Sequence, residues 1–117
     1  MDSLLSSLPR QIHFAALVGG VVARRRRAAG LNQTELARVV EMNQAGWSKI
    51  ERGVISLSLE YLTLVAPALG VEPAVILDEA ERVARYVEGL GVQVARHRQV
   101  RSEVEALAAW IEAALGG

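Results

Sequence analysis

The chain has 117 residues, enough for one domain or for a small domain with an appendage. Hydrophobic residues make up 51% and charged residues 22%, so a core can form and disorder throughout the chain is excluded. Cysteine is absent, which excludes disulfides, thiolate metal sites and cysteine nucleophiles together. The two histidines, His13 and His97, are too far apart to indicate a metal site. We therefore expect no metal and no cofactor, and we expect both histidines at a surface or an interface.

The formal net charge of zero hides an uneven distribution. Residues 1–53 carry eight basic and four acidic side chains, a net charge of +4, and residues 54–117 carry five basic and nine acidic ones, a net charge of −4. This asymmetry indicates a basic binding surface followed by an acidic part with another task. Chance segregation of solvated charges is the alternative.

No targeting or membrane segment is expected. The N-terminus carries the acidic Asp2, whereas a signal peptide begins with a positively charged region. Pro9 and Arg10 also interrupt the first apolar stretch. The uncharged run from Phe14 to Ala23 is roughly half of the ~20 residues that span a bilayer. We expect a soluble, cytoplasmic protein with no membrane partner.

The first half of the chain predicts three helices. Apolar residues at three- and four-residue spacing mark a helix from Phe14 that ends near Gly30. Asn32 and Glu35 form a predicted capping box that opens a short helix through Val40. Asn43 is the predicted N-cap of a third helix that closes at Gly53.

Two more helices and a break follow. Ser58 precedes a fourth helix, 59–69, in which Pro67 is expected to kink or shorten the last turn. Pro73 suits the first turn of a fifth helix that runs to about Glu88. After the break at 89–91, residues 92–94 fit either a short strand or a continuing helix.

The C-terminal segment carries an apolar stripe at heptad-like spacing, which indicates a helix that buries this face against the fifth helix, a second chain or both. The stripe consists of Val100, Val104, Leu107, Ile111 and Ala114. We predict a homodimer interface at Val100, Val104, Leu107 and Ile111. Trp110 lies beside the stripe and fits a core, dimer or ligand contact. The predicted organisation is an N-terminal extension at 1–11, a DNA-binding domain at 12–77 and a helical dimerisation segment at 78–117.

The most informative stretch joins the second and third helices. Two short helices linked by a turn of three or four residues are typical of a helix-turn-helix. The apolar positions where these helices must pack together are Leu36, Val40, Met42, Trp47 and Ile50. We therefore read Trp47 as a core residue in preference to a stacking platform for bases. This packing leaves the outer face of the third helix free for a DNA groove.

At these residues the chain resembles the Cro-type helix-turn-helix family, also called the XRE family, of phage repressors and bacterial regulators. The pattern L-x-Q-x-x-L-A appears at 31–37, and I-E-x-G appears at 50–53. A further pattern of Ser-Leu-Glu-x-Leu appears at 58–62, and Ala-x-x-Leu-Gly-Val appears at 66–71. Together with Val22 and Arg26, these pieces cover about residues 18–77.

The resemblance implies an all-α, five-helix, lambda-repressor-like domain that binds double-stranded DNA. It implies a sequence-specific transcriptional regulator, expected to be a repressor acting as a homodimer on a palindromic operator. It also implies an internal ion pair between Arg26 and Glu51. An enzyme is not expected, because no nucleophile–base pair, phosphate loop or metal set is present.

The predicted contacts to DNA come from both helices of the motif. Base contacts are expected from Gln44, Ala45, Ser48 and Lys49, whose amide, methyl, hydroxyl and ammonium groups can meet base edges. Phosphate contacts are expected from Asn32, Gln33, Arg25 and Asn43. Arg25 belongs to the run of four arginines at 24–27. The alternative for it is a solvent-exposed position on the helix surface without a contact to phosphate.

Three features depart from the family pattern. Glu41 stands where the turn usually has glycine with a positive φ, and Gly46 lies inside the third helix. The loop 54–57 is apolar where many relatives have polar or basic residues that contact phosphates.

A different function class shares the same fold. An antitoxin would use its acidic C-terminal half to bind a partner toxin and its helix-turn-helix to regulate its own operon. The helical periodicity of the C-terminal segment favours a dimerising repressor, because antitoxin tails are often disordered. A toxin-like reading frame next to the gene would favour the antitoxin.

Overall fold

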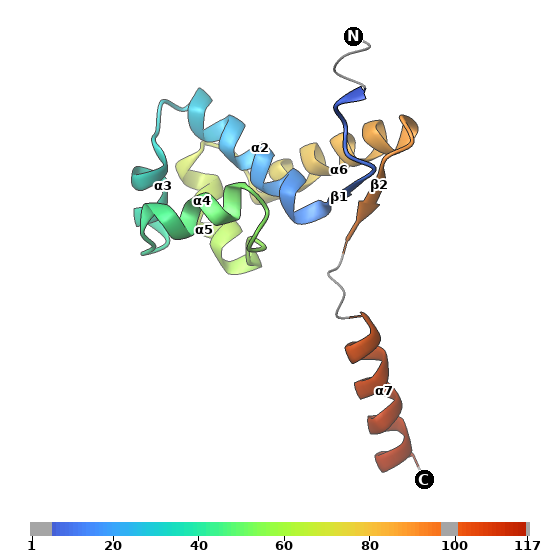
Figure 1. Cartoon of the computed structure of the whole chain (residues 1–117). Helices are drawn as coiled ribbons and strands as arrows, with labels where there is room; N and C mark the ends of the chain where they lie inside the picture. The colour runs from blue at the N-terminus through green and yellow to red at the C-terminus, as the bar shows by residue number, and fades with distance from the viewer. Residues whose placement is uncertain (1–5, 97–100, 117) are drawn as a thin grey trace.

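The computed structural model describes residues 6–96 and 101–116, and the side chains from residue 106 onward in the second range. The elements in chain order are β1 (Gln11–His13), α2 (Phe14–Ala28), α3 (Gln33–Val39), α4 (Gln44–Glu51), α5 (Leu59–Ala68), α6 (Pro73–Gly89), β2 (Gln93–Ala95) and α7 (Arg101–Leu115). The predicted all-α class is confirmed as a mostly helical fold, to which the structure adds one short pair of strands. In Figure 1, α2 to α6 form the body, and α7 stands apart from it.

The helix starts follow the predicted capping residues. The side chain of Asn32 accepts a hydrogen bond from the N–H of Glu35, whose carboxylate accepts one from the N–H of Asn32. Asn43 and Ser58 cap α4 and α5 in the same way, through the N–H groups of Gly46 and Tyr61. These bonds satisfy N–H groups that a helix start otherwise leaves without partners.

Five helices, α2 to α6, end in one backbone arrangement. In each, two consecutive N–H groups after the helix bond back to carbonyls of its last turn, as the N–H groups of Glu41 and Met42 do with Arg38 and Ala37. The residue in the left-handed conformation is a glycine in four of these five helices and Glu41 in α3. α5 stops one residue after Pro67, in agreement with the predicted shortening.

One hydrophobic core joins these five helices. Fully buried side chains come from each of them, including Val22, Leu36, Trp47, Val65 and Ile76. Burying a large aliphatic or aromatic side chain contributes about 1.5–3 kcal/mol relative to leaving it exposed, so these residues fix how the helices pack. Because Trp47 and Ile50 point into this core, the opposite face of α4 is left at the surface.

β1 and β2 form a parallel pair that the sequence indicated only in part. Residues 92–94 were compatible with strand or helix, and the structure has a strand at 93–95, whereas the partner strand at 11–13 was not predicted. Gln11, Ile12 and His13 face Gln93, Val94 and Ala95 in register. The turn at Gly91, with φ +90°, directs the chain back toward the N-terminal segment, where the N–H of Gln93 donates to the carbonyl of Arg10 at 2.9 Å.

α6 runs without a break across the expected domain boundary between residues 77 and 78. Its buried residues Ile76, Ala80, Ala84 and Val87 recur at helical spacing, and Ile76 and Ala80 belong to the common core. The same helix therefore anchors the helical body and forms the first part of the segment that was expected to dimerise.

α7 exposes the residues of the predicted stripe that the structure describes. Leu107 and Ile111 are 57% and 42% exposed, and Trp110 is 66% exposed. Val100 and the side chain of Val104 lie outside the described residues. The radius of gyration, 17.1 Å, exceeds the roughly 13 Å of a compact domain of this length, in line with the position of α7 in Figure 1.

Over the described ranges no single helix has the length and apolarity to cross a membrane. α5 and α6 meet that requirement only as a pair, and they are bent by 104° relative to each other. No three histidine or acidic side chains gather at metal-binding distances in these ranges.

Candidate nucleic-acid interface

A tight turn sets the angle between α3 and α4. Glu41 adopts φ +56°, the left-handed conformation that favours glycine. A residue with a Cβ pays about 1–2 kcal/mol in this conformation. Two backbone hydrogen bonds, from the N–H groups of Glu41 and Met42 to the carbonyls of Arg38 and Ala37, close α3 and hold this turn in place.

Gly46 in α4 leaves room for a neighbouring side chain. A Cβ at this position would lie 2.9 Å from Cε of Met42 and 3.2 Å from Oδ1 of Asn43, the oxygen that caps α4. Met42 packs against the core from the turn. The glycine thus lets the turn and the start of α4 approach closely, which offsets its low helix propensity.

A buried carboxylate connects the three helices around the motif. Arg26 of α2 donates to Glu51 through Nε, 2.7 Å from Oε2, and through Nη2, 3.1 Å from Oε1. Trp47 Nε1 donates to Oε2 at 2.7 Å, and Gln33 Nε2 donates to Oε1 at 2.9 Å. The side chains of Arg26 and Glu51 are only 10% and 4% exposed. The ion pair implied by the family resemblance is therefore present, and it also holds the first residue of α3.

This arrangement favours the charged form of Glu51. Burial alone raises the pKa of Glu51, but the hydrogen bonds from Arg26, Gln33 and Trp47 outweigh it and hold the pKa below its ordinary value. Arg26 also donates through Nη1 to the carbonyl of Leu31 at 2.8 Å. The guanidinium thus bridges the end of α4 and the segment between α2 and α3.

Gln33 links this buried group to the start of α4. Its Oε1 accepts a hydrogen bond from Nε2 of Gln44 at 2.6 Å, while its Nε2 donates to Glu51. Gln44 keeps its amide oxygen and one N–H, which are the two groups that a bidentate contact to adenine uses. The structure therefore brings a predicted phosphate contact and a predicted base contact together, a pairing that sequence reasoning missed.

The outer face of α4 presents the other predicted base contacts. Ala45 and Lys49 are exposed and Ser48 is half-buried. Arg52 is also exposed and follows Lys49 by three residues and Ser48 by four, so it lies on the same face. It was not among the predicted contacts, although its spacing from Ser48 could have indicated it.

The side chains predicted to contact phosphates have different partners in the structure. Asn32 and Asn43 use their side-chain oxygens to cap α3 and α4. Arg25 forms an ion pair with Glu79 of α6, and this hydrogen bond lowers the pKa of Glu79. Arg25 thus braces α2 against α6, and the structure does not bring it together with Gln33, Asn32 and Asn43.

The fold matches known proteins. A family model described as a helix-turn-helix domain matches residues 17–100, more than half of the chain. The chain belongs to this helix-turn-helix family. No curated protein sequence matches the chain.

Two solved structures similar to this helix-turn-helix protein are crystal structures of the clp gene regulator ClgR from Corynebacterium glutamicum. One is 30% identical, with a TM-score of 0.56, over 60% of this chain and 91% of that chain. The other is 24% identical, with a TM-score of 0.57, over 93% of this chain and 100% of that chain, and at that identity it supports the fold alone.

Proposed function

We propose that the protein is a DNA-binding transcriptional regulator that represses by occluding a promoter. α4 is its recognition helix in the major groove, where Gln44, Ala45, Ser48 and Lys49 read base edges. Gln33, Asn32 and Asn43 position the motif on phosphates, and Arg52 adds to them. Such a protein acts with the DNA in the cytoplasm and needs no chemistry, cofactor or metal.

The observation that carries this proposal is the buried carboxylate of Glu51. It binds α4 to α2 through Arg26 and to α3 through Gln33, and Trp47 of α4 also donates to it, so the exposed face of α4 is presented at a fixed angle. Reading base edges needs such rigidity, because bidentate hydrogen bonds tolerate little misplacement. The family match and the similarity to ClgR, a clp gene regulator, support the same function.

We further propose that the regulator acts as a homodimer held by residues 73–115. One helix-turn-helix contacts few base pairs, whereas a two-fold dimer on a palindrome doubles the contacts, with recognition helices ~34 Å apart. The exposed apolar side chains of α7 support this assembly, because a soluble chain rarely leaves such a face uncovered.

The decisive experiment selects bound sequences from a random DNA pool and then titrates variants on the winning site and on a scrambled one. Gln44→Ala and Lys49→Ala should each cost about 1–3 kcal/mol on the selected site and relax preference at particular base pairs. Thr63→Ala, at an exposed position of α5 outside both the motif and the proposed dimer segment, is the matched control and should bind like the wild type.

Absence of any preferred sequence at moderate salt contradicts the function. If both recognition-helix variants keep the wild-type preference, the function stands and the assignment of α4 is wrong. A wild-type chain that sediments as a monomer at micromolar concentration contradicts the homodimer separately.

A further inference from the structure

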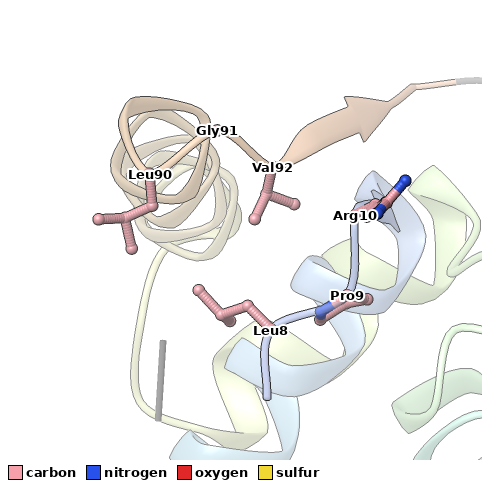
Figure 2. A pocket seen from close by; sticks show the side chains of 6 residues that line it. All are labelled: Leu8, Pro9, Arg10, Leu90, Gly91 and Val92. Atoms are coloured by element: carbon pink, nitrogen blue, oxygen red, sulfur yellow. The ribbon is translucent and has the colours of Figure 1, made fainter. Parts of the chain in front are cut away.

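The N-terminal segment lies beside the chain that leaves α6. Figure 2 shows the six side chains that line a small pocket between the two segments, Leu8, Pro9, Arg10, Leu90, Gly91 and Val92. The N–H of Val92 donates to the carbonyl of Val87 at 3.0 Å, so the chain is held to the end of α6 up to this residue. From Gln93 onward it pairs with β1, starting with the N–H of Gln93, which donates to the carbonyl of Arg10 at 2.9 Å.

Arg96 follows β2 and contacts two helices. Its guanidinium donates to both carboxylate oxygens of Glu81 of α6, at 2.5 and 2.8 Å, and its Nη2 lies 4.0 Å from Oε1 of Glu88. The same guanidinium lies over the ring of Phe14, the first residue of α2, 4.8 Å from the ring centroid. A bidentate ion pair and a cation–π contact together fix the position of a guanidinium. We refer to the β1–β2 pair together with Arg96 as the clip.

The clip acts on the part of the body that supports the end of α4. Phe14, which Arg96 covers, lies two residues before Ala16. A Cβ at Gly53, just after α4, would be 2.6 Å from the backbone nitrogen of Ala16, so the two backbones are in direct contact. The point at which the chain leaves the body is therefore fixed relative to the proposed recognition helix.

The clip also limits the distance between the body and α7. Arg101, the first residue of α7, follows Arg96 by five residues, and in any conformation this stretch spans at most about 18 Å. Without the clip the chain is held only as far as Val92, and the nine residues from there to Arg101 can span about 32 Å. Opening the clip thus nearly doubles the reach of α7.

We propose that Arg96 is a positioning residue that sets which spacing of DNA half-sites the regulator accepts. In a homodimer held through α7, the closed clip keeps each recognition helix at a short, fixed reach from the dimer axis, so one separation of the half-sites fits both helices. With the clip open, the longer reach lets the helices bind half-sites at several separations. The inference rests on the proposed homodimer and adds a specificity that base contacts do not supply.

Amide hydrogen exchange measures whether the clip is closed. The amide of Gln93 should be protected in the wild type, because it donates to a carbonyl of the N-terminal segment. Arg96→Ala removes a partly exposed ion pair and a cation–π contact, so it should speed exchange of this amide about tenfold while the circular dichroism spectrum stays unchanged. The amide of Tyr61, which donates to the capping side chain of Ser58, should keep its rate.

DNA binding measures what the clip does. The operator selected from the random pool is remade with one and with two base pairs added between its half-sites. The wild type should lose at least about tenfold in affinity on each longer site, because the added base pairs shift and rotate one half-site. Arg96→Ala should lose less than about threefold. Arg82→Ala is the matched control, since it removes the same charge from an ion pair with Asp78 within α6, and it should behave like the wild type in both measurements.

Two further chains separate the reach of the linker from the side chain of Arg96. Four glycine and serine residues inserted after Arg96 lengthen the linker with the clip closed, so this chain should accept the longer sites with unchanged exchange at Gln93. Ile12→Cys with Val94→Cys places the chain's only two thiols opposite each other in β1 and β2, where they can form a disulfide. In the Arg96→Ala background this disulfide should restore the wild-type spacing preference, and its reduction should remove it.

The other outcomes overturn the inference. A wild-type chain that sediments as a monomer contradicts the proposed homodimer, and the inference falls with it. Fast exchange of the Gln93 amide in a dimeric wild type means that the clip is open in solution, which contradicts the inference alone. An unchanged spacing preference in Arg96→Ala or in the lengthened chain also overturns it, because the reach of α7 then plays no part in recognition.

Discussion

At the scale of single residues, Glu51 is the group on which the geometry of the motif depends. Its carboxylate accepts hydrogen bonds from Arg26, Gln33 and Trp47, three side chains on three helices. A buried charge is tolerated only when it is paired and hydrogen-bonded, which is the case here. The same hydrogen bonds therefore stabilise the fold and hold the exposed face of α4 in its orientation.

Glu51→Gln should destabilise the fold strongly. The substitution leaves the guanidinium of Arg26 buried without an opposite charge, a change that costs about 3–5 kcal/mol in comparable pairs. Chemical denaturation measures the loss. Glu81→Gln is the matched control, because its ion pair with Arg96 is partly exposed and should contribute little. Equal midpoints for the two variants would contradict the assigned role.

Glu51 also predicts a pH dependence. Its pKa is lower in the folded than in the unfolded chain, so the unfolded chain binds the proton more tightly and folding stability rises with pH. The contribution is complete above the unfolded-state pKa of about 4.3 and is lost as the pH falls through the folded-state pKa. Unfolding free energy measured from pH 6 to pH 3 should fall less steeply in Glu51→Gln than in the wild type.

Glu41 carries backbone strain that glycine would relieve. Glu41→Gly should raise the unfolding free energy by up to about 1.5 kcal/mol, because the left-handed conformation no longer costs about 1–2 kcal/mol while glycine loses about 0.5–1 kcal/mol of chain entropy. Glu60→Gly, in the first turn of α5, should instead lower it by about 1 kcal/mol. A loss of stability in both variants would mean that the conformation at Glu41 is not strained.

At the scale of elements, the close packing of α2 against α4 requires glycine, which has no side chain, at positions 19 and 53. A Cβ at Gly19 would overlap the carbonyl oxygens of Ile50 and Glu51, and it would be 2.6 Å from the latter. A Cβ at Gly53 would be 2.6 Å from the backbone nitrogen of Ala16. The end of the proposed recognition helix thus lies directly on the backbone of α2 near Ala16 and Gly19, about two turns before Arg26.

Alanine substitutions at two neighbouring glycines of α2 should change the stability of the fold in opposite directions. Gly19→Ala forces α4 away from α2 and should destabilise by several kcal/mol, in the range of overpacked cores or beyond. Gly20→Ala adds its Cβ to open space and should stabilise by about 1 kcal/mol, the helix propensity difference. Thermal unfolding of the pair is the measurement, and a stable Gly19→Ala variant would contradict the close approach of α2 and α4.

At the scale of the whole molecule, the two signs of charge occupy different parts of the chain. The basic half contains the helix-turn-helix, and the acidic half contains α6 and α7. A protein that neutralises phosphates releases counterions, so its affinity for DNA falls with salt in proportion to the number of contacts. The acidic half is repelled by the same phosphates, which favours an approach of DNA to the half that contains the helix-turn-helix.

Arg52→Ala should reduce the salt slope of DNA binding by about one per subunit, if Arg52 meets a phosphate as its position on α4 indicates. Arg85→Ala on α6 removes the same charge from the other part of the molecule and should leave the slope unchanged. Titrations at several salt concentrations on specific and scrambled DNA make the comparison. A lowered salt slope for Arg85→Ala alone would mean that the DNA contacts α6 and not the face of α4 that carries Arg52.

The sequence by itself determined the helices of the body and the location of the motif. Local signals carry this information, because capping side chains such as Asn32, Asn43 and Ser58 and the glycines that end helices act within a few residues of their own position. The pattern at 31–37 and 50–53 placed the turn and the ion pair of Arg26 with Glu51 through a family resemblance. Homodimerisation and the DNA contacts stay predictions.

Only the tertiary structure decided which distant side chains meet. Gln33 was expected to face phosphate, and packing of α3 on α4 placed its amide between Glu51 and Gln44. Arg25 was expected near DNA, and packing of α2 on α6 paired it with Glu79. The pairing of β1 with β2 joins segments some eighty residues apart, and such short strands carry no periodicity long enough to be recognised before their partner is known.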